Sequence, residues 1–179
     1  MVLVALTVAA ALLVGRLRGG RLRHLAAVSF SGGPLVVIAA AAQFLFALAP
    51  SPAAAVALTA ASQIALLTFL WWNRYLAGAL LIAVGSTLNS AVILANGAMP
   101  VSRDAMLAIA RHPAEMSGGR HRLLAPTDAL PQLADIIGLP VLRTVVSVGD
   151  IVLAAGLGLL VVATMAQPRS ARVPAVDAG

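Results

Sequence analysis

Four amide or carboxyl side chains lie inside the long apolar runs of this chain: Gln43, Gln63, Asn89 and Asp150. Such groups are costly in hydrocarbon, so they usually face a partner or a water-filled cavity. One interpretation is a polar pocket walled by Gln43, Asn89 and Asp150 in the outer half of a helical bundle. The other is hydrogen bonding between helices, worth about 0.6–2 kcal/mol per contact. We favour helix–helix contacts and keep the pocket as the alternative.

Asp150 is the single residue with the most chemical options. It stands in the stretch SVGDI, at the start of an apolar run. Its carboxylate could cap a helix, close to the positive N-terminal end of the helix, although Ser147 competes for the same role. An acid at a membrane boundary could instead move protons or bind a cation. Helix capping is the favoured interpretation.

Two further sets of residues suggest catalysis or metal binding. His112, Glu115 and His121 are of types that bind zinc, but their spacing does not place them on one helical face. Asp128 and Asp135 suggest a pair of carboxylates, but Pro131 between them would interrupt a shared helix. The sequence has no phosphate loop, serine elbow, zinc helix or dinucleotide fingerprint. We therefore predict no catalytic residues, no metal and no cofactor.

The composition excludes an ordinary soluble domain. Of the 179 residues, 61% are apolar and 10% are charged, against about 45–50% and about 25% in typical globular proteins. So few charges cannot cover the surface, and lipid must surround much of the chain. Every basic residue is an arginine, and the net charge is +6. Because the arginines lie beside apolar runs, they predict contact with anionic lipid and not with nucleic acid.

The apolar runs predict an all-α integral membrane bundle of about five transmembrane helices. Crossing the hydrocarbon core takes about 20 residues. The first run is short and spans only if Arg16 and Arg18 extend to the interface. We expect one transmembrane domain over residues 1–166, with short turns that make helices two to four successive neighbours, and a disordered cytoplasmic tail at 167–179. The expected spans are 1–17, 34–49, 53–72, 76–95 and 148–166.

Arginine placement predicts the orientation. Cytoplasmic segments are enriched in basic residues, and the short segments on one side contain seven arginines against five on the other. The protein is thus expected in the plasma membrane with its N-terminus outside and its C-terminus in the cytoplasm. The arginines expected to contact lipid headgroups at the inner boundary are Arg16, Arg18, Arg21, Arg23 and Arg74.

A loop motif ends the fourth predicted helix. Asn96 and Gly97 favour a left-handed turn, and Pro100 disfavours helix at Met99. Ser102 then fits the N-cap of a short new helix. Residues 96–147 are interrupted by glycine and proline, and their apolar pieces are too short to span. They predict a partly helical extracytoplasmic cap between the fourth and fifth transmembrane helices.

Three stretches in this order carry a family resemblance: GRLRGGRLRHL after the first run, NGAMPVS at the end of the fourth, and SVGDI before the last. The chain resembles the uncharacterised bacterial membrane-protein family catalogued as domain of unknown function (DUF) 5317. The resemblance implies a multi-span membrane protein and no particular activity. The chain departs from the family at Ala98, where glycine is more frequent.

Three functional hypotheses follow. The leading one is a non-enzymatic membrane component that binds a lipid or a protein partner through its outer cap, with a homo-oligomer as a further option. The alternative is a small transporter or lipid-translocating module that uses the polar pocket. The third is a membrane-embedded enzyme with a carboxylate or histidine site.

Overall fold

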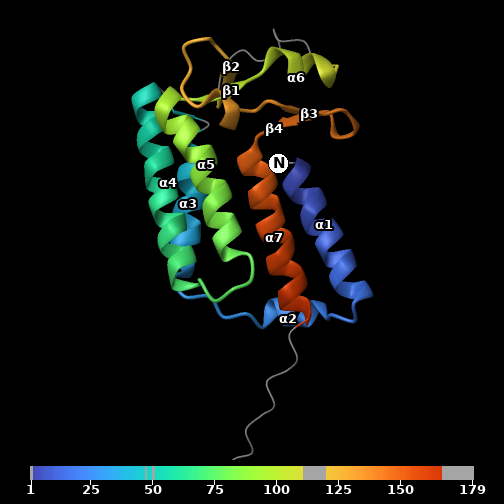
Figure 1. Ribbon diagram of the computed structural model, residues 1–179. Coiled ribbons are helices and arrows are strands. Elements are labelled where there is room, and N and C mark those ends of the chain that lie inside the picture. The colour runs from blue at the N-terminus through green and yellow to red at the C-terminus, as the bar shows by residue number, and fades with distance from the viewer. Residues whose placement is uncertain (1, 47, 50, 111–119, 167–179) are drawn as a thin grey trace, which may run out of the picture.

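The computed structural model describes residues 2–46, 48–49, 51–110 and 120–166, and it is mostly helical (Figure 1). Three helices are long and apolar enough to cross a membrane. They are α4 (Pro52–Trp72), α5 (Ala79–Asn96) and α7 (Val148–Ala166). Two further apolar helices, α1 (Val2–Leu17) and α3 (Gly33–Phe46), are shorter, at 16 and 14 residues. These five helices occupy the five apolar runs, with ends that differ from the predicted spans by a few residues.

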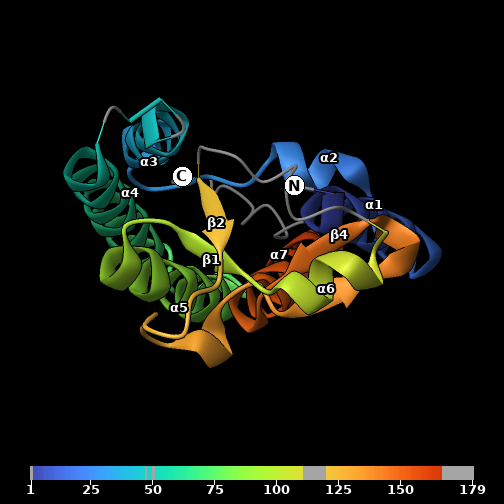
Figure 2. The ribbon, with the colours of Figure 1, turned by 90° about the horizontal axis from the view of Figure 1, so that it is seen from above.

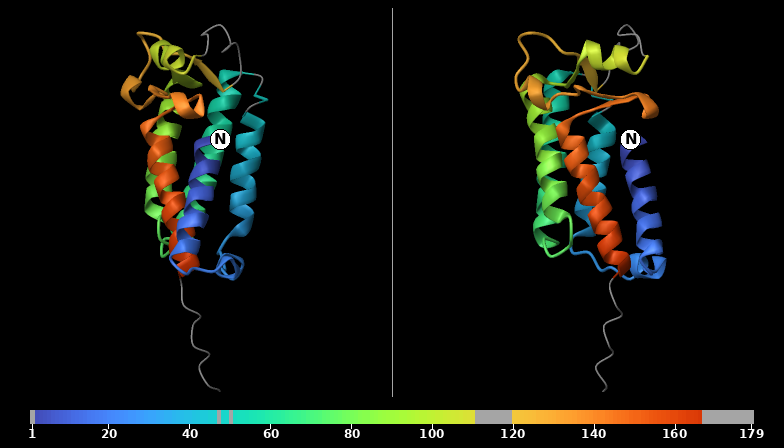
Figure 3. Two further views of the ribbon diagram at one scale, coloured as in Figure 1. Left: turned by 90° about the vertical axis from the view of Figure 1, so that its right-hand side faces the viewer. Right: turned by 45° about the vertical axis from the view of Figure 1, so that its right-hand side comes forward.

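The five long helices form an open arc. α3 packs on α4, α4 on α5, α5 on α7 and α7 on α1. Seen from above, α1 and α3 stand at the two ends of the arc (Figure 2). The helices α3, α4 and α5 are successive neighbours, as their short turns predict. Side views show the five helices running side by side along one direction (Figure 3).

Glycine lets α5 and α7 approach closely. A Cβ added at Gly85 would lie 2.6 Å from the carbonyl oxygen of Gly149, and one at Gly156 would lie 2.7 Å from the backbone nitrogen of Ile82. Both distances are too short for any side chain, so backbone packs against backbone at this interface. Small residues that permit such contact are common between membrane helices.

The connecting segment between α5 and α7, described at residues 97–110 and 120–147, lies over one end of the helices (Figure 1). It contains helix α6 (Arg103–Ala108) and four strands that the sequence analysis did not predict: β1 (Met99–Val101), β2 (His121–Leu123), β3 (Ile137–Leu139) and β4 (Thr144–Val146). β1 pairs with β2 in parallel, and β3 pairs with β4 antiparallel. The described part of the segment also contains two short 3-10 turns, η2 (Pro131–Leu133) and η3 (Pro140–Leu142).

A short helix, α2 (Leu22–Ala26), lies at the opposite end of the bundle (Figure 1). No helix is predicted at these residues from the sequence alone. Contacts with the end of α7 fix the position of α2, because the backbone nitrogen of Arg21 donates to the carbonyl oxygen of Met165 at 3.1 Å. The His24 ring nitrogen Nδ1 lies 2.9 Å from the same oxygen. This contact satisfies a carbonyl that the last turn of α7 leaves without a helical partner.

Candidate functional site

Asn89 and Asp150, two of the four polar candidates, meet at the start of α7. The Asn89 amide donates to Asp150 Oδ1 at 2.7 Å, and the Ser147 hydroxyl donates to Asn89 Oδ1 at 2.8 Å. Ser147 Oγ also accepts from the backbone nitrogen of Asp150 at 2.9 Å, while Asp150 Oδ2 accepts from the backbone nitrogen of Ser147 at 3.2 Å. This reciprocal pair is a capping box that begins α7. Both Ser147 and Asp150 therefore cap the helix, and Asn89 joins the cap to α5.

Gln63 lies at a different interface, between α4 and α5. Its amide nitrogen donates to Thr87 Oγ1 at 3.0 Å and to Ser86 Oγ at 3.3 Å. Its carbonyl oxygen accepts from the Ser90 hydroxyl at 2.9 Å. All of these partners belong to α5, so Gln63 joins α4 to α5 by side-chain hydrogen bonds.

Gln43 lies at a third interface, between α3 and α4. Its amide nitrogen donates to Ser62 Oγ at 3.1 Å, and the Ser62 hydroxyl donates to the Ala39 carbonyl at 3.0 Å. The Gln43 carbonyl oxygen accepts from Arg120 Nη2. The four polar candidates thus occupy three separate helix interfaces, and only Asn89 and Asp150 contact each other.

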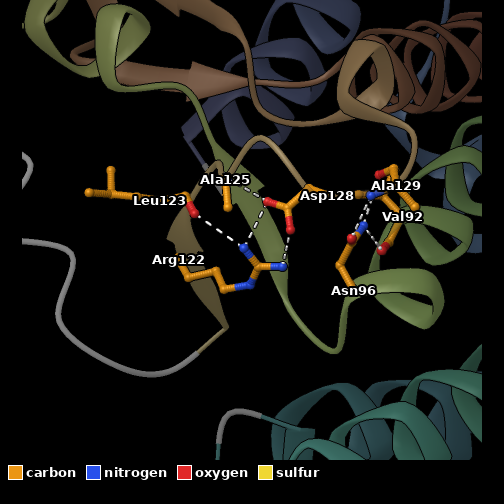
Figure 4. A network of polar contacts seen from close by, with 7 residues as sticks. All are labelled: Val92, Asn96, Arg122, Leu123, Ala125, Asp128 and Ala129. Carbon is orange, nitrogen blue, oxygen red and sulfur yellow. Dashed lines mark hydrogen bonds and ion pairs between the residues drawn. The ribbon is translucent and has the colours of Figure 1, made fainter.

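The loop motif organises the connecting segment. Gly97 has a φ of 74°, and its nitrogen donates to the Ile93 carbonyl at 2.7 Å, which ends α5. Asn96 then binds the backbone of Ala129 in both directions: its amide donates to the Ala129 carbonyl at 3.0 Å and its carbonyl accepts from the Ala129 nitrogen at 2.9 Å (Figure 4). This contact holds the far part of the connecting segment to the end of α5.

Met99 and Pro100 lie in β1, between two other pieces of chain. The Met99 nitrogen donates to the Arg120 carbonyl at 2.9 Å on one side. On the other side, the Asp135 nitrogen donates to the Pro100 carbonyl at 3.0 Å and the Ser102 nitrogen donates to the Asp135 carbonyl at 2.9 Å. β1 is thereby the central strand of the segment, and its three residues are buried. Met99 and Pro100 therefore occupy a buried, structural position in the connecting segment.

Asp128 forms an ion pair with Arg122. Arg122 Nη1 donates to Asp128 Oδ2 at 2.8 Å and Nη2 donates to Oδ1 at 2.5 Å, in the bidentate form shown in Figure 4. The hydrogen bond from Arg122 lowers the pKa of Asp128, and the same bond raises the pKa of Arg122. Among the described residues, no hydrogen bond or ion pair joins Asp128 to Asp135.

Asp135 and His121 form the other titratable pair. His121 Nε2 lies 3.6 Å from Asp135 Oδ2. Burial raises the pKa of Asp135 to about 7, with a smaller contribution from the negative charge of Asp150. Burial also lowers the pKa of His121. Among the described side chains, Asp135 Oδ1 is the buried polar atom that has no hydrogen-bond partner.

No metal centre forms within the described ranges. They contain no group of three or more histidine, aspartate or glutamate residues placed to hold an ion. His112 and Glu115, two members of the predicted metal alternative, lie outside the described residues, as does the predicted tail at 167–179.

The five arginines expected at lipid headgroups are all exposed. Arg16 lies in the last turn of α1, Arg23 lies in α2, and the other three lie between α1 and α2 or after α4. This is the end of the bundle opposite the connecting segment (Figure 1). The Arg74 guanidinium carbon lies 5.0 Å from the centroid of a Trp71 ring. Exposed aromatic and basic side chains on one level are typical of a membrane–water interface.

Several polar residues of the structure were not singled out from the sequence. Asn73 is fully buried and binds the backbone of Ser31 in both directions, which fixes the loop before α3. Ser62 and Arg120 serve as partners of Gln43. Asn73 directly follows Trp72 at the end of an apolar run, and that position was the only sequence signal for it.

The described residues thus define a mostly helical protein with helices able to cross a membrane. Side-chain hydrogen bonds join the helices, and a small strand-containing segment lies over one end. A model described as a family of unknown function (DUF5317) matches residues 27–162. The chain belongs to this family, which confirms the resemblance drawn from its motifs. Comparison with curated proteins found no match, nor did comparison with solved structures.

Proposed function

We propose that this chain is a five-span, non-enzymatic component of the plasma membrane that binds lipid through its outer cap. The observation that carries the proposal is the exposed apolar surface of the two helices at the ends of the arc. Leu13 on α1 is 61% exposed, and Val37 and Phe44 on α3 are 68% and 69% exposed. Each of these helices packs on a single long neighbour, so apolar surface of this extent calls for a lipid solvent.

The lengths of the helices are compatible with five spans. At a rise of about 1.5 Å per residue, α1 and α3 measure about 24 and about 21 Å, against a hydrocarbon thickness of about 30 Å. Exposed arginines at one end of α1 can extend to the headgroups, and the bilayer can thin locally around short helices. Such thinning costs a fraction of about 1 kcal/mol per Å of mismatch.

The proposed orientation has the N-terminus outside and the C-terminus in the cytoplasm. The exposed arginines around α2 and after α4 support it, because basic residues concentrate on the cytoplasmic side. The connecting segment at the opposite end of the bundle is then the outer cap.

The polar contacts favour a binding role over transport. A transport path needs polar groups free to line it. Gln43, Gln63 and Asn89 are instead hydrogen-bonded at three different helix interfaces. A protein partner or a second copy covering α1 and α3 remains an outcome that the experiments below would detect.

The topology can be tested with single cysteines, since the chain has none of its own. Val141, 94% exposed in the connecting segment, and Arg74, exposed after α4, are the two positions to replace. A membrane-impermeant maleimide added to intact spheroplasts should label Val141→Cys, and should label Arg74→Cys only after permeabilisation. Equal labelling of both variants in intact spheroplasts would contradict the topology. Release of the protein from membranes by alkaline carbonate would contradict an integral protein.

Lipid binding is tested on the protein purified in a mild detergent. Native mass spectrometry should find phospholipid bound to the folded chain after extensive washing. Recovery of the chain free of lipid, or as a lipid-free complex with another protein, would overturn the lipid-binding role.

A further inference from the structure

Arg120 reaches from the connecting segment to the last turns of α3. Its guanidinium carbon lies 4.9 Å from the centroid of the Phe46 ring, and its Nη2 donates to the Gln43 carbonyl oxygen. The residue is half-buried, and burial lowers the pKa of its guanidinium. A cation that has lost part of its hydration interacts more strongly with an anion than a fully hydrated one does.

The orientation of Gln43 is fixed by α4. The Gln43 amide nitrogen is occupied by Ser62, whose own hydroxyl proton goes to the Ala39 carbonyl. The Gln43 carbonyl oxygen must therefore face Arg120. One nitrogen and one face of the guanidinium are held in this way. No other described residue accepts a hydrogen bond from the remaining N–H donors of its planar fork.

An apolar surface continues from this cation along α3. Ala40 and Val36 precede Gln43 by three and seven residues, so they lie beside it on the helix, on the side that faces away from α4. Both are exposed. The face that packs on α4 is formed instead by buried residues such as Ala39 and Ala42. A fixed cation at the end of an exposed apolar helix face matches the layout of a phospholipid, with its phosphate above its acyl chains.

Charge argues for a lipid over a second copy of the chain at this surface. An opposing protein would have to bring an acidic group to Arg120. Among the described acids, Asp128 is bound to Arg122, Asp150 is bound to Asn89 and Asp135 is buried. Only Asp104 among them is exposed. Within the described residues, Arg120 has no carboxylate within ion-pair distance.

We propose that Arg120, positioned by Gln43 and Phe46, binds the phosphate of an anionic phospholipid whose acyl chain lies along α3 at Val36 and Ala40. The assignment rests on the proposed lipid-binding function and names its site. The guanidinium fork accommodates phosphate oxygens in a bidentate arrangement. A lipid with a net negative charge is preferred over a zwitterionic one, because no positive headgroup then opposes the arginine.

The test measures phosphatidylglycerol binding to the full chain by native mass spectrometry in detergent. Arg120→Gln should weaken the affinity at least about tenfold, which corresponds to about 1.4 kcal/mol. Arg103→Gln is the matched control: it removes one charge from an exposed arginine of the same segment, at the start of α6. Its affinity should stay within about twofold of wild type, because an exposed ion contact contributes little.

Three outcomes would overturn the site. They are an unchanged affinity in Arg120→Gln, equal wild-type affinities for phosphatidylglycerol and phosphatidylcholine, and competition by soluble glycerol phosphate as effective as that by the lipid. The last result would mean a free-anion site. Arg120→Lys retains the charge without the fork and should bind with intermediate affinity, which keeps the test usable if Arg120→Gln unfolds.

A second measurement reports proximity directly. Phe46→Trp places a fluorophore beside Arg120, and brominated phosphatidylglycerol should quench it more than brominated phosphatidylcholine does. Trp71 and Trp72 lie at the far end of α4 and provide the background, measured in wild type. If wild type holds no phospholipid at all, the proposed function fails. If wild type and Arg120→Gln hold phosphatidylglycerol equally, only the site fails.

Discussion

His121 Nε2 lies 3.6 Å from Asp135 Oδ2, within the connecting segment, where both residues flank β1. Asp135 is held there by two backbone hydrogen bonds to β1 and its neighbour Ser102, and its carboxyl group is buried. The negative charge of Asp150 raises the pKa of both residues, and the charge of Arg120 lowers that of His121. Burial outweighs these charges, so the pair favours a neutral acid beside a neutral imidazole.

This pair predicts a pH-dependent stability. Burial raises the pKa of Asp135 to about 7 in the folded state, from 3.8 in the unfolded chain. Between these two values the folded state keeps a proton on Asp135 that the unfolded chain has released. The contribution of Asp135 to the free energy of unfolding is therefore complete below about pH 4 and is lost as the pH rises through about 7. Asp135→Asn mimics the protonated acid. It should stabilise the protein relative to wild type at about pH 8, by up to roughly 4 kcal/mol, and much less at about pH 5.

Thermal unfolding in detergent at the two pH values measures this difference. The lowered pKa of His121 acts in the opposite sense, because its contribution to the free energy of unfolding is lost as the pH falls. His121 is present in both proteins, so this contribution largely cancels in the comparison. Asp104→Asn, which removes an exposed acid in α6, is the control for the loss of one carboxylate and should change the melting temperature little. A constant difference between wild type and Asp135→Asn across the range would contradict the prediction.

The ring of Asn89, Ser147 and Asp150 predicts a stability effect rather than a transport effect. Asn89→Leu removes two hydrogen bonds and leaves the buried Ser147 hydroxyl without its acceptor. The expected loss is about 1–3 kcal/mol in unfolding free energy. Asp150→Asn keeps the shape and weakens the cap by about 1 kcal/mol. Unfolding of both single variants and the double variant gives their coupling, which should be clearly non-zero.

Additivity of the two substitutions would argue against the ring. A change in the flux of an ion or lipid with no loss of stability would favour the transporter alternative. The same variants therefore separate the two functional hypotheses.

The close approach of α5 and α7 predicts intolerance of side chains at Gly85. In Gly85→Ala the new methyl group would lie 2.6 Å from the Gly149 carbonyl oxygen, which is backbone and cannot turn aside. The helices must separate, and we expect a loss of at least about 2 kcal/mol, as in other overpacked cores. Gly33→Ala is the control, because a Cβ there meets nothing within 4 Å. Equal melting temperatures of the two variants would contradict the interface.

The positions of the long helices were predictable from the sequence. Apolar runs of sufficient length form helices in a lipid environment because the backbone must satisfy its own hydrogen bonds there. Local signals were equally informative at the ends: Gly97 takes a left-handed conformation at the end of α5, and Ser102 caps α6 by accepting from the Ala105 nitrogen. These features depend on residues within about one turn of each other.

The neighbours of each helix beyond the short turns, and the partners of most polar residues, depended on the tertiary structure. Asn89 meets Asp150 across 61 residues and Arg120 meets Gln43 across 77. Apolar helix faces carry almost no directional signal, since lipid and protein are both apolar surroundings for them. The strands β1 and β2 were missed for a related reason: three-residue strands are defined by a distant partner and not by a local period. Length and apolarity alone determined where helices form, whereas the contacts that give Asn89, Asp135 and Arg120 their roles exist only once the chain has folded.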